Sequence, residues 1–158
     1  MIIPLLTVDL PRLIAGAEIP AEHSCRGQDT SPAVVWSEPP VGTAAFAVVV
    51  DDPDAPGGTF VHWVAYNLPA SARGLPKDVA PRDPAVPQGI NSFRRRGWSG
   101  PCPPQGSTHR YFVRVYALDA ALSVPAAPTR AALDAGMLGH VLATGEWMGR
   151  FSMPLSLP

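Results

Sequence analysis

Proline constrains the fold of this chain more than any other residue type, since 20 of its 158 residues are proline. Proline has no backbone N–H to donate, so it ends helices and is confined to loops and to the edges of sheets. The hydrophobic fraction of 46% is ordinary for a globular protein and excludes a disordered or collagen-like chain. The sequence therefore predicts a mainly β fold of short strands and long connections, in a single domain over residues 1–158.

Several segments have the composition of strands, because they are rich in Val, Phe, Tyr or Trp and are bounded by Pro, Gly or Asp. One helix is expected after Thr129, which follows Pro128 as an N-cap candidate. Its apolar stripe consists of Leu133, Met137, Leu138 and Val141, before Gly145. The expected strands are residues 34–36, 46–50, 60–68 and 111–118, with 147–151 as a last strand.

The charges are almost balanced, with 12 basic and 13 acidic residues and a formal net charge of −1. No field of the whole chain would attract nucleic acid or an anionic membrane, so no nucleic-acid partner is expected. The apolar residues 1–10 lack the charged start and the small-residue cleavage site of a signal peptide, and no later segment is long enough to span a bilayer. We therefore expect a cytoplasmic protein without integral membrane association.

The two cysteines, Cys25 and Cys102, are too few for a disulfide scaffold. They have no CxxC spacing, which disfavours a zinc site and thioredoxin-type chemistry. The sequence leaves open whether they form a single disulfide.

The first informative segment, residues 51–63, places three carboxylates among prolines at the end of an apolar strand, followed by His62. Prolines fix φ and can hold a carboxylate such as Asp52 facing inward. The alternative is an Asp-Pro turn whose acids cap backbone amides. Two X-Pro bonds lie close together here, and we expect that of Ala55–Pro56 to be cis.

The second informative segment is residues 100–111. Side chains alternate along a strand, so His109, Tyr111 and Val113 are expected to share one face. The Gly100 amide is open to close approach, and together these groups would suit an oxyanion. The alternative is a hydrogen-bonded core pair of histidine and tyrosine.

The combination of DPDAP with His62-Trp63, and of GPCPP with His109-Arg110-Tyr111, resembles the phosphatidylethanolamine-binding protein family, which includes Raf kinase inhibitor protein. The resemblance covers roughly residues 7–151 and is strongest to the bacterial and archaeal branch. Further matching segments are Ile19-Pro20, residues 24–27, Ser31-Pro32, Trp36, and residues 40–43, 67–69, 116–119 and 139–143.

The resemblance implies a β-sandwich in which a large antiparallel sheet packs on a smaller one, with Greek-key connections and a peripheral C-terminal helix. It also implies a small pocket for phosphate, phosphoethanolamine-like or carboxylate ligands. A carboxylate repels an anion unless a proton intervenes, so Asp52 is expected to act through His62 or a protonated ligand oxygen. The implied ligand-binding residues are Asp52, Pro53, His62, Gly100, Pro101, His109 and Tyr111.

The chain also departs from the family pattern. The segment of residues 57–61 is short relative to animal members, so kinase regulation does not transfer. Gly97-Trp98-Ser99 stands where many bacterial relatives have Gly-Tyr-Gly, so the pocket wall is expected to differ in shape.

Other chemistries are disfavoured. Asp52, His62 and His109 have the ligand types of a metal triad, but the resemblance gives no support for one. The chain has neither a G-x-S-x-G elbow nor a P-loop. We therefore expect no catalytic residues, metal or cofactor. The run Arg94–Arg96 is interpreted as a solvated loop, with anion steering into the pocket as the alternative.

We expect a binding protein that recognises a small anion and uses its occupancy to regulate a partner protein of unknown identity. The alternative is a protease inhibitor acting through rigid exposed loops, and an uncharacterised hydrolase is the third reading. We also expect a homodimer, from relatives and from Trp147, Met148 and Phe151, which a small sheet would leave partly exposed.

Overall fold

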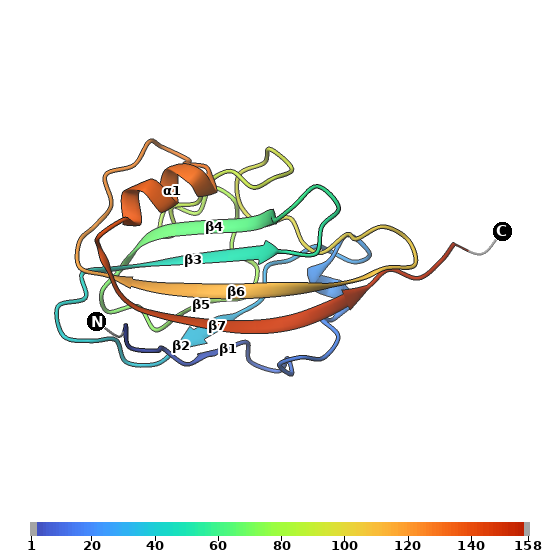
Figure 1. Ribbon diagram of the computed structural model, residues 1–158, viewed down its shortest axis with the longest axis horizontal. Helices are drawn as coiled ribbons and strands as arrows, with labels where there is room; N and C mark the ends of the chain where they lie inside the picture. The colour runs from blue at the N-terminus through green and yellow to red at the C-terminus, as the bar shows by residue number, and fades with distance from the viewer. Residues whose placement is uncertain (1–2, 157–158) are drawn as a thin grey trace.

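Two antiparallel sheets packed face to face form the protein in the computed structural model, which describes residues 3–156 (Figure 1). The large sheet has the order β4-β3-β6-β7, and the small sheet has the order β1-β2-β5. The expected sandwich of a larger and a smaller sheet is thus confirmed. The large sheet consists of β3 (Ala45–Asp52), β4 (Phe60–Pro69), β6 (Thr108–Leu118) and β7 (Val141–Ser152), and the small one of β1 (Val8–Asp9), β2 (Val34–Trp36) and β5 (Gly74–Leu75).

The chain does not fill the large sheet in sequence order. After β4 it contributes β5 to the small sheet and returns as β6 beside β3, in the non-sequential manner of a Greek-key connection. The prolines lie mostly in the long loops that make these connections, as their missing donors require. The two-residue strands β1 and β5 were not predicted, because two residues carry no periodic signal.

The strand β3 has an apolar core on both of its faces, and all eight of its residues are buried. Phe46, Val48 and Val50 pack between the two sheets, whereas Ala47 and Val49 pack on the opposite face. Burying a side chain of this size stabilises the fold by about 1.5–3 kcal/mol. The central strand therefore holds its two terminal carboxylates on opposite faces of the sheet.

Helix α1 (Arg130–Met137) covers part of that opposite face, as Figure 1 shows. The predicted N-cap is confirmed, because the Thr129 hydroxyl accepts a hydrogen bond from Ala132 N at 3.2 Å. Leu133 and Met137 are buried against the sheet. The prediction that the helical stripe extends to Val141 was wrong: Gly139 has a φ of +81°, which ends the helix, and Val141 begins β7.

The apolar C-terminal residues do not form the partly exposed patch that we expected. Trp147 and Phe151 are 4% and 2% exposed, because alternate residues of β7 face the core between the sheets. That argument for a homodimer was therefore wrong, and dimerisation stays a prediction from the resemblance. Within residues 3–156, no helix has the length and apolar character needed to cross a membrane.

Candidate functional site

A cavity of about 240 Å³ opens where β3 ends and where β4 and β6 begin. The antiparallel register places Asp52 opposite Phe60, so these strand ends meet at one edge of the sandwich. The cavity brings together Asp52, His62, His109 and Tyr111, as the sequence predicted. Its other lining residues are mainly apolar and comprise Ala55, Pro56, Phe60, Phe93, Cys102, Pro103 and Pro104.

Asp51, the first of the three crowded carboxylates, faces away from the cavity. It is buried on the outer face of the sheet, where Arg114 Nε and Arg130 Nη1 lie 3.0 and 2.9 Å from its Oδ2. Asp52 lies on the inner face because successive side chains of a strand alternate. The pair of neighbouring aspartates therefore serves two purposes, since Asp51 fastens α1 to the sheet and Asp52 enters the cavity.

Asp52 accepts hydrogen bonds on both of its oxygens. Asp54 N donates to Oδ1 at 2.8 Å, and His109 Nδ1 donates to Oδ2 at 2.7 Å. Asp54 itself forms a bidentate pair with Arg110, at 2.9 and 2.8 Å, which lowers the pKa of its carboxyl to about 2. Both readings of this segment thus hold for Asp52, which caps a turn amide and also faces into the cavity.

The peptide bond of Ala55–Pro56 is trans, so the prediction of a cis bond was wrong. The chain reverses by other means. Gly58 has a φ of +107°, and its amide donates to Ala55 O at 3.1 Å. Glycine supplies the sharp change of direction that we assigned to a cis proline.

A β-bulge places His62 in the cavity. The register between β3 and β4 shifts from Val50↔Trp63 to Asp51↔Val61, which leaves His62 as the extra residue. Val61 consequently packs under α1 and Trp63 packs between the sheets, although regular alternation would give both the same face. A bulge of this kind re-aims a side chain beside a functional site. Strand periodicity alone would not have predicted it.

The hydrogen bond at His62 Nδ1 fixes the form of its ring. Nδ1 donates to Ser99 O at 2.6 Å, because a carbonyl oxygen only accepts. Burial lowers the pKa of His62 from its ordinary value of 6.5. The ring is therefore neutral at pH 7, and its Nε2 presents a lone pair. Ser99, which the sequence analysis did not select, is held in turn by Asn91 Nδ2 at 3.0 Å from its hydroxyl.

Tyr111 supplies a free donor. Its hydroxyl is buried near the Asp52 carboxylate but lies within hydrogen-bond distance of no described residue. Burial, and then the negative charge of Asp52, raise the pKa of the phenol, so it stays protonated. Its ring packs edge-on against His62, with the ring centroids 5.3 Å apart. Buried polar groups are nearly always hydrogen-bonded, so an unpartnered hydroxyl in a cavity indicates a place for a ligand or a water.

Gly100, Pro101 and Pro53 were predicted to line the pocket and are not among the residues that do. The Gly100 amide is engaged elsewhere, since it donates to Asp29 Oδ1 at 2.8 Å. Its lack of a side chain serves packing, because a Cβ there would collide with the backbone oxygen of His23. The prediction that the Gly100 amide lines the cavity was therefore wrong.

Cys25 and Cys102 form a disulfide at this wall of the cavity, which answers the question that the sequence left open. Cys25 N also donates to Pro101 O at 3.1 Å. Asp29 accepts hydrogen bonds from Trp98 as well as from Gly100. These bonds join the same two loops as the disulfide, one that contains Cys25 and one that contains Cys102. The segment Gly97-Trp98-Ser99, where the chain departs from many bacterial relatives, thus helps to hold this wall of the cavity in place through Trp98.

The cavity lining includes two phenylalanine rings, and a run of three arginines follows one of them in the sequence. Phe60 and Phe93 pack edge to face with centroids 4.7 Å apart. Arg94 and Arg95, which follow Phe93, are exposed, as expected for a solvated loop, and Arg96 is half-buried. Among residues 3–156, no arginine or lysine lines the cavity itself. Among the described residues, no group of three or more His, Cys, Asp or Glu side chains could hold a metal ion.

The geometry and the comparisons with known proteins agree on one class. The sequence model of the phosphatidylethanolamine-binding protein family matches residues 11–152. The chain belongs to this family.

Particular relatives place it among prokaryotic members. A UPF0098 protein of Aquifex aeolicus is 43% identical over 140 residues, which cover 86% of this chain and 82% of that protein. A Mycobacterium tuberculosis protein named lipoprotein LppC is 41% identical over 126 residues, covering 78% of this chain and 61% of that one. The crystal structure of E. coli YbcL, described as a member of the mammalian PEBP family, superposes with a TM-score of 0.86 at 33% identity, covering 94% and 98% of the two chains.

Proposed function

We propose that the cavity binds a small phosphate-type anion in its singly charged, protonated form and that occupancy regulates a partner protein. The observation that carries the proposal is the buried, unpartnered hydroxyl of Tyr111 beside the hydrogen-bonded pair of Asp52 and His109. The family's name points to a phosphoethanolamine-type head group as the ligand class.

The hydrogen-bond donors and the acceptor in the cavity complement the oxygens and the single proton of such a ligand. Tyr111 O–H donates to a ligand oxygen, and a protonated His109 Nε2 would donate to another. Neutral His62 offers only an acceptor at Nε2, and Asp52 repels a bare anion. A phosphate monoester that keeps one proton can donate that proton to His62. A dianion has no proton to donate and meets no arginine or lysine among the described residues of the cavity lining.

Size and polarity also suit a head group. A cavity of about 240 Å³ is slightly smaller than the usual range for drug-sized ligands, which begins at about 300 Å³. The rings of Phe60 and Phe93 and the prolines of the rim give the ligand's non-polar part a surface to pack on. We therefore propose a small monoester with its phosphate at the floor and its substituent at the rim.

We also propose that the protein does not turn its ligand over. Among the described residues that line the cavity there is no serine or threonine hydroxyl, and the Cys102 sulfur is held in the disulfide. The Asp52–His109 pair has the geometry of a general base, but the described lining offers it no side-chain nucleophile to activate and no arginine or lysine to stabilise a leaving group. Binding without chemistry is the function that this set of groups supports.

The disulfide is informative about the cellular compartment in which the protein acts. We expected a cytoplasmic protein because no signal-peptide pattern was found. Disulfides are rare in the cytosol and typical of oxidising compartments, and one relative is named as a lipoprotein. We therefore propose that the protein acts in an oxidising compartment, which redox-state analysis of the two cysteines in cells would test.

Calorimetric titration with phosphoethanolamine at pH 6 tests the binding proposal. Wild-type protein should bind it, and Tyr111→Phe should bind it more weakly by about 1.5–3 kcal/mol, the size of a hydrogen bond to a charged group. Tyr66→Phe, at a half-buried tyrosine outside this cavity, is the control and should match the wild type. Equal affinities for all three proteins would contradict the proposal, as would steady release of phosphate from the ligand.

A further inference from the structure

The arginines of this chain fall into two groups. Arg73, Arg110, Arg114 and Arg130 form ion pairs with carboxylates. Within residues 3–156, the remaining arginine side chains form neither an ion pair nor a hydrogen bond. They are Arg12, Arg26, Arg82, Arg94, Arg95, Arg96 and Arg150. A net charge of −1 does not predict such a separation, because there are enough carboxylates for every cation.

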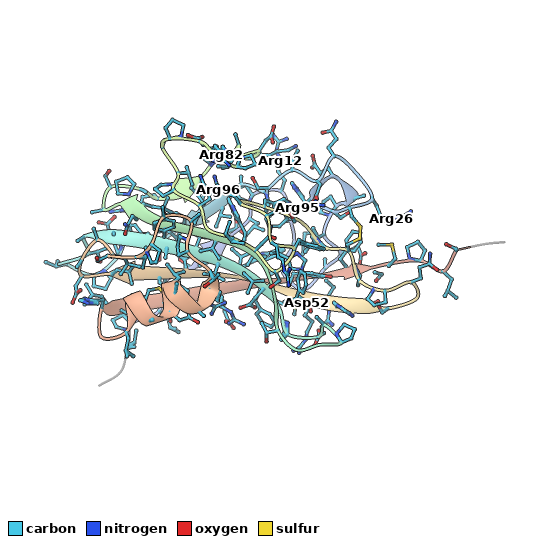
Figure 2. All side chains as sticks on the ribbon, turned by 90° about the horizontal axis from the view of Figure 1, so that it is seen from above. Arg12, Arg26, Asp52, Arg82, Arg95 and Arg96 are labelled. Carbon is cyan, nitrogen blue, oxygen red and sulfur yellow. A yellow bond between two sulfur atoms is a disulfide. The ribbon has the colours of Figure 1, made fainter. Side chains whose placement is uncertain are left out.

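Most of the unpaired arginines lie on one side of the protein. Figure 2 shows all five labelled arginines on the same side of the ribbon, with helix α1 on the opposite side. They come from four separate segments of the chain, since only Arg95 and Arg96 are neighbours in the sequence, and the fold places them on one side. We call Arg12, Arg26, Arg82, Arg95 and Arg96 the arginine surface. A cluster of unneutralised charges of this kind raises the local concentration of anions.

Part of the arginine surface is concave. Arg82 and Arg96 line a second cavity of about 290 Å³, which shares no lining residue with the anion cavity. Pro81, Pro84 and the ring of Tyr66 contribute to its walls. The two arginines therefore flank a partly apolar hollow instead of a flat face.

The walls of this second cavity are fixed by internal hydrogen bonds. Asp83 N donates to Ala80 O at 3.0 Å, and the Asp83 carboxylate accepts from Ala85 N at 2.9 Å. The buried Gln88 donates through Nε2 to Ala80 O at 2.8 Å and accepts from Trp63 Nε1 at 2.8 Å. A preformed hollow loses little conformational entropy when a ligand enters it.

We infer that the arginine surface docks an acidic segment of a partner protein, with one carboxylate of that segment held between Arg82 and Arg96. Guanidinium groups bind carboxylates bidentately, and the proline and tyrosine walls suit the apolar residues that flank them. This inference supplies the partner chemistry for the regulation proposed above. It does not depend on the identity of the small ligand.

The charge pattern favours a polypeptide over other polyanions. Asp83 lines the same cavity as the two arginines, so a continuous row of phosphates would meet a carboxylate there. A polypeptide carries discrete charges and can place a backbone N–H or an apolar side chain opposite Asp83. A flat membrane surface would also leave the hollow between Arg82 and Arg96 unfilled.

A fluorescent peptide in which glutamates alternate with leucines tests the inference by anisotropy at low salt. Wild-type protein should bind the peptide, and the double variant Arg82→Gln/Arg96→Gln should bind it at least about tenfold more weakly, the size of one or two lost charge-assisted hydrogen bonds. Arg150→Gln removes an unpaired, exposed arginine of β7 outside the second cavity and should leave the affinity unchanged. Thermal unfolding of the variants shows that each is folded.

Three further measurements separate the alternatives. Phosphoethanolamine should bind equally to wild type and double variant, which keeps failure of this inference distinct from failure of the proposed function. Binding of phosphatidylserine vesicles or of single-stranded DNA should be weaker than peptide binding and should not depend on Arg82 and Arg96. The inference is overturned if the peptide does not bind, if the double variant binds it like the control, or if vesicles or DNA depend on these arginines as strongly as the peptide.

Discussion

His109 donates its Nδ1 proton to Asp52 Oδ2 across 2.7 Å, and both residues are buried where they line the cavity at the end of β3. The pair joins the last residue of β3 to the start of β6, which are distant in the sequence and adjacent in the sheet. Because Asp52 fixes the ring through Nδ1, the other nitrogen of His109 is available to the ligand that we propose. The same carboxylate also holds the turn after β3, so the loop and the site share one anchor.

Removing the His109 ring should weaken ligand binding, whereas removing a similarly paired histidine ring outside the cavity should not. His109→Ala should lose about 1.5–3 kcal/mol of binding free energy for phosphoethanolamine, the range for a hydrogen bond to a charged group. His140 provides a matched control, since its Nδ1 also lies 2.7 Å from a carboxylate oxygen, of Asp119, but on an exposed surface. Calorimetry should show normal affinity for His140→Ala. A similar loss in both variants would contradict the assignment of His109 to the site.

Ligand affinity should fall as the pH rises from about 6 to 8. A phosphate monoester loses its second proton near pH 6, and the dianion cannot donate to the neutral His62 ring. Dimethyl phosphate, a monoanion with no proton, should bind more weakly than phosphoethanolamine at pH 6. Calorimetric titrations across this range provide the measurement. An affinity that rises with pH would show that the site selects the dianion.

The lowered pKa of His62 predicts how stability changes with pH. Because the folded state binds this proton less readily than the unfolded state, the contribution of His62 is present above the unfolded pKa of 6.5 and is lost as the pH falls below it. Urea unfolding at pH 7 and pH 5 should therefore show lower stability at pH 5. His62→Asn, which retains a donor for Ser99 O, should reduce that difference. An unchanged difference in this variant would rule out His62 as its source.

Reducing the disulfide should destabilise both the fold and the site. The bond joins residues that are 77 apart in the sequence, and removal of such a crosslink typically costs about 2–4 kcal/mol. Cys25→Ser/Cys102→Ser should unfold at lower urea concentration and bind phosphoethanolamine more weakly, because Cys102 lines the cavity. Addition of a reductant should lower the urea midpoint of the wild type but not of the double variant. A wild-type midpoint that does not respond to reduction would contradict this role.

The sequence predicted most of the large sheet, but strand alternation predicted only some of the side chains that enter the cavity. Alternation along β6 correctly placed His109 and Tyr111 on one face, because β6 pairs with β7 through both residues without a register shift. It could not predict that His62 enters the cavity, because a bulge in β4 reverses the alternation at that residue. Nor could it assign the Gly100 amide, whose partner Asp29 is 71 residues away in the sequence. Contacts between loops that are distant in sequence leave no periodic signal.

The most direct test of the account is the NMR spectrum of the four histidine rings during titration with phosphoethanolamine at pH 6. His62 and His109 line the cavity, whereas His23 is hydrogen-bonded to Thr30 O in the loop behind it and His140 lies on the surface with Asp119. We expect saturable shifts of the His62 and His109 ring nitrogens, with little change at His23 and His140. Equal shifts at all four rings, or shifts at His140 without any at His62 and His109, would contradict the claim that this cavity is the ligand site.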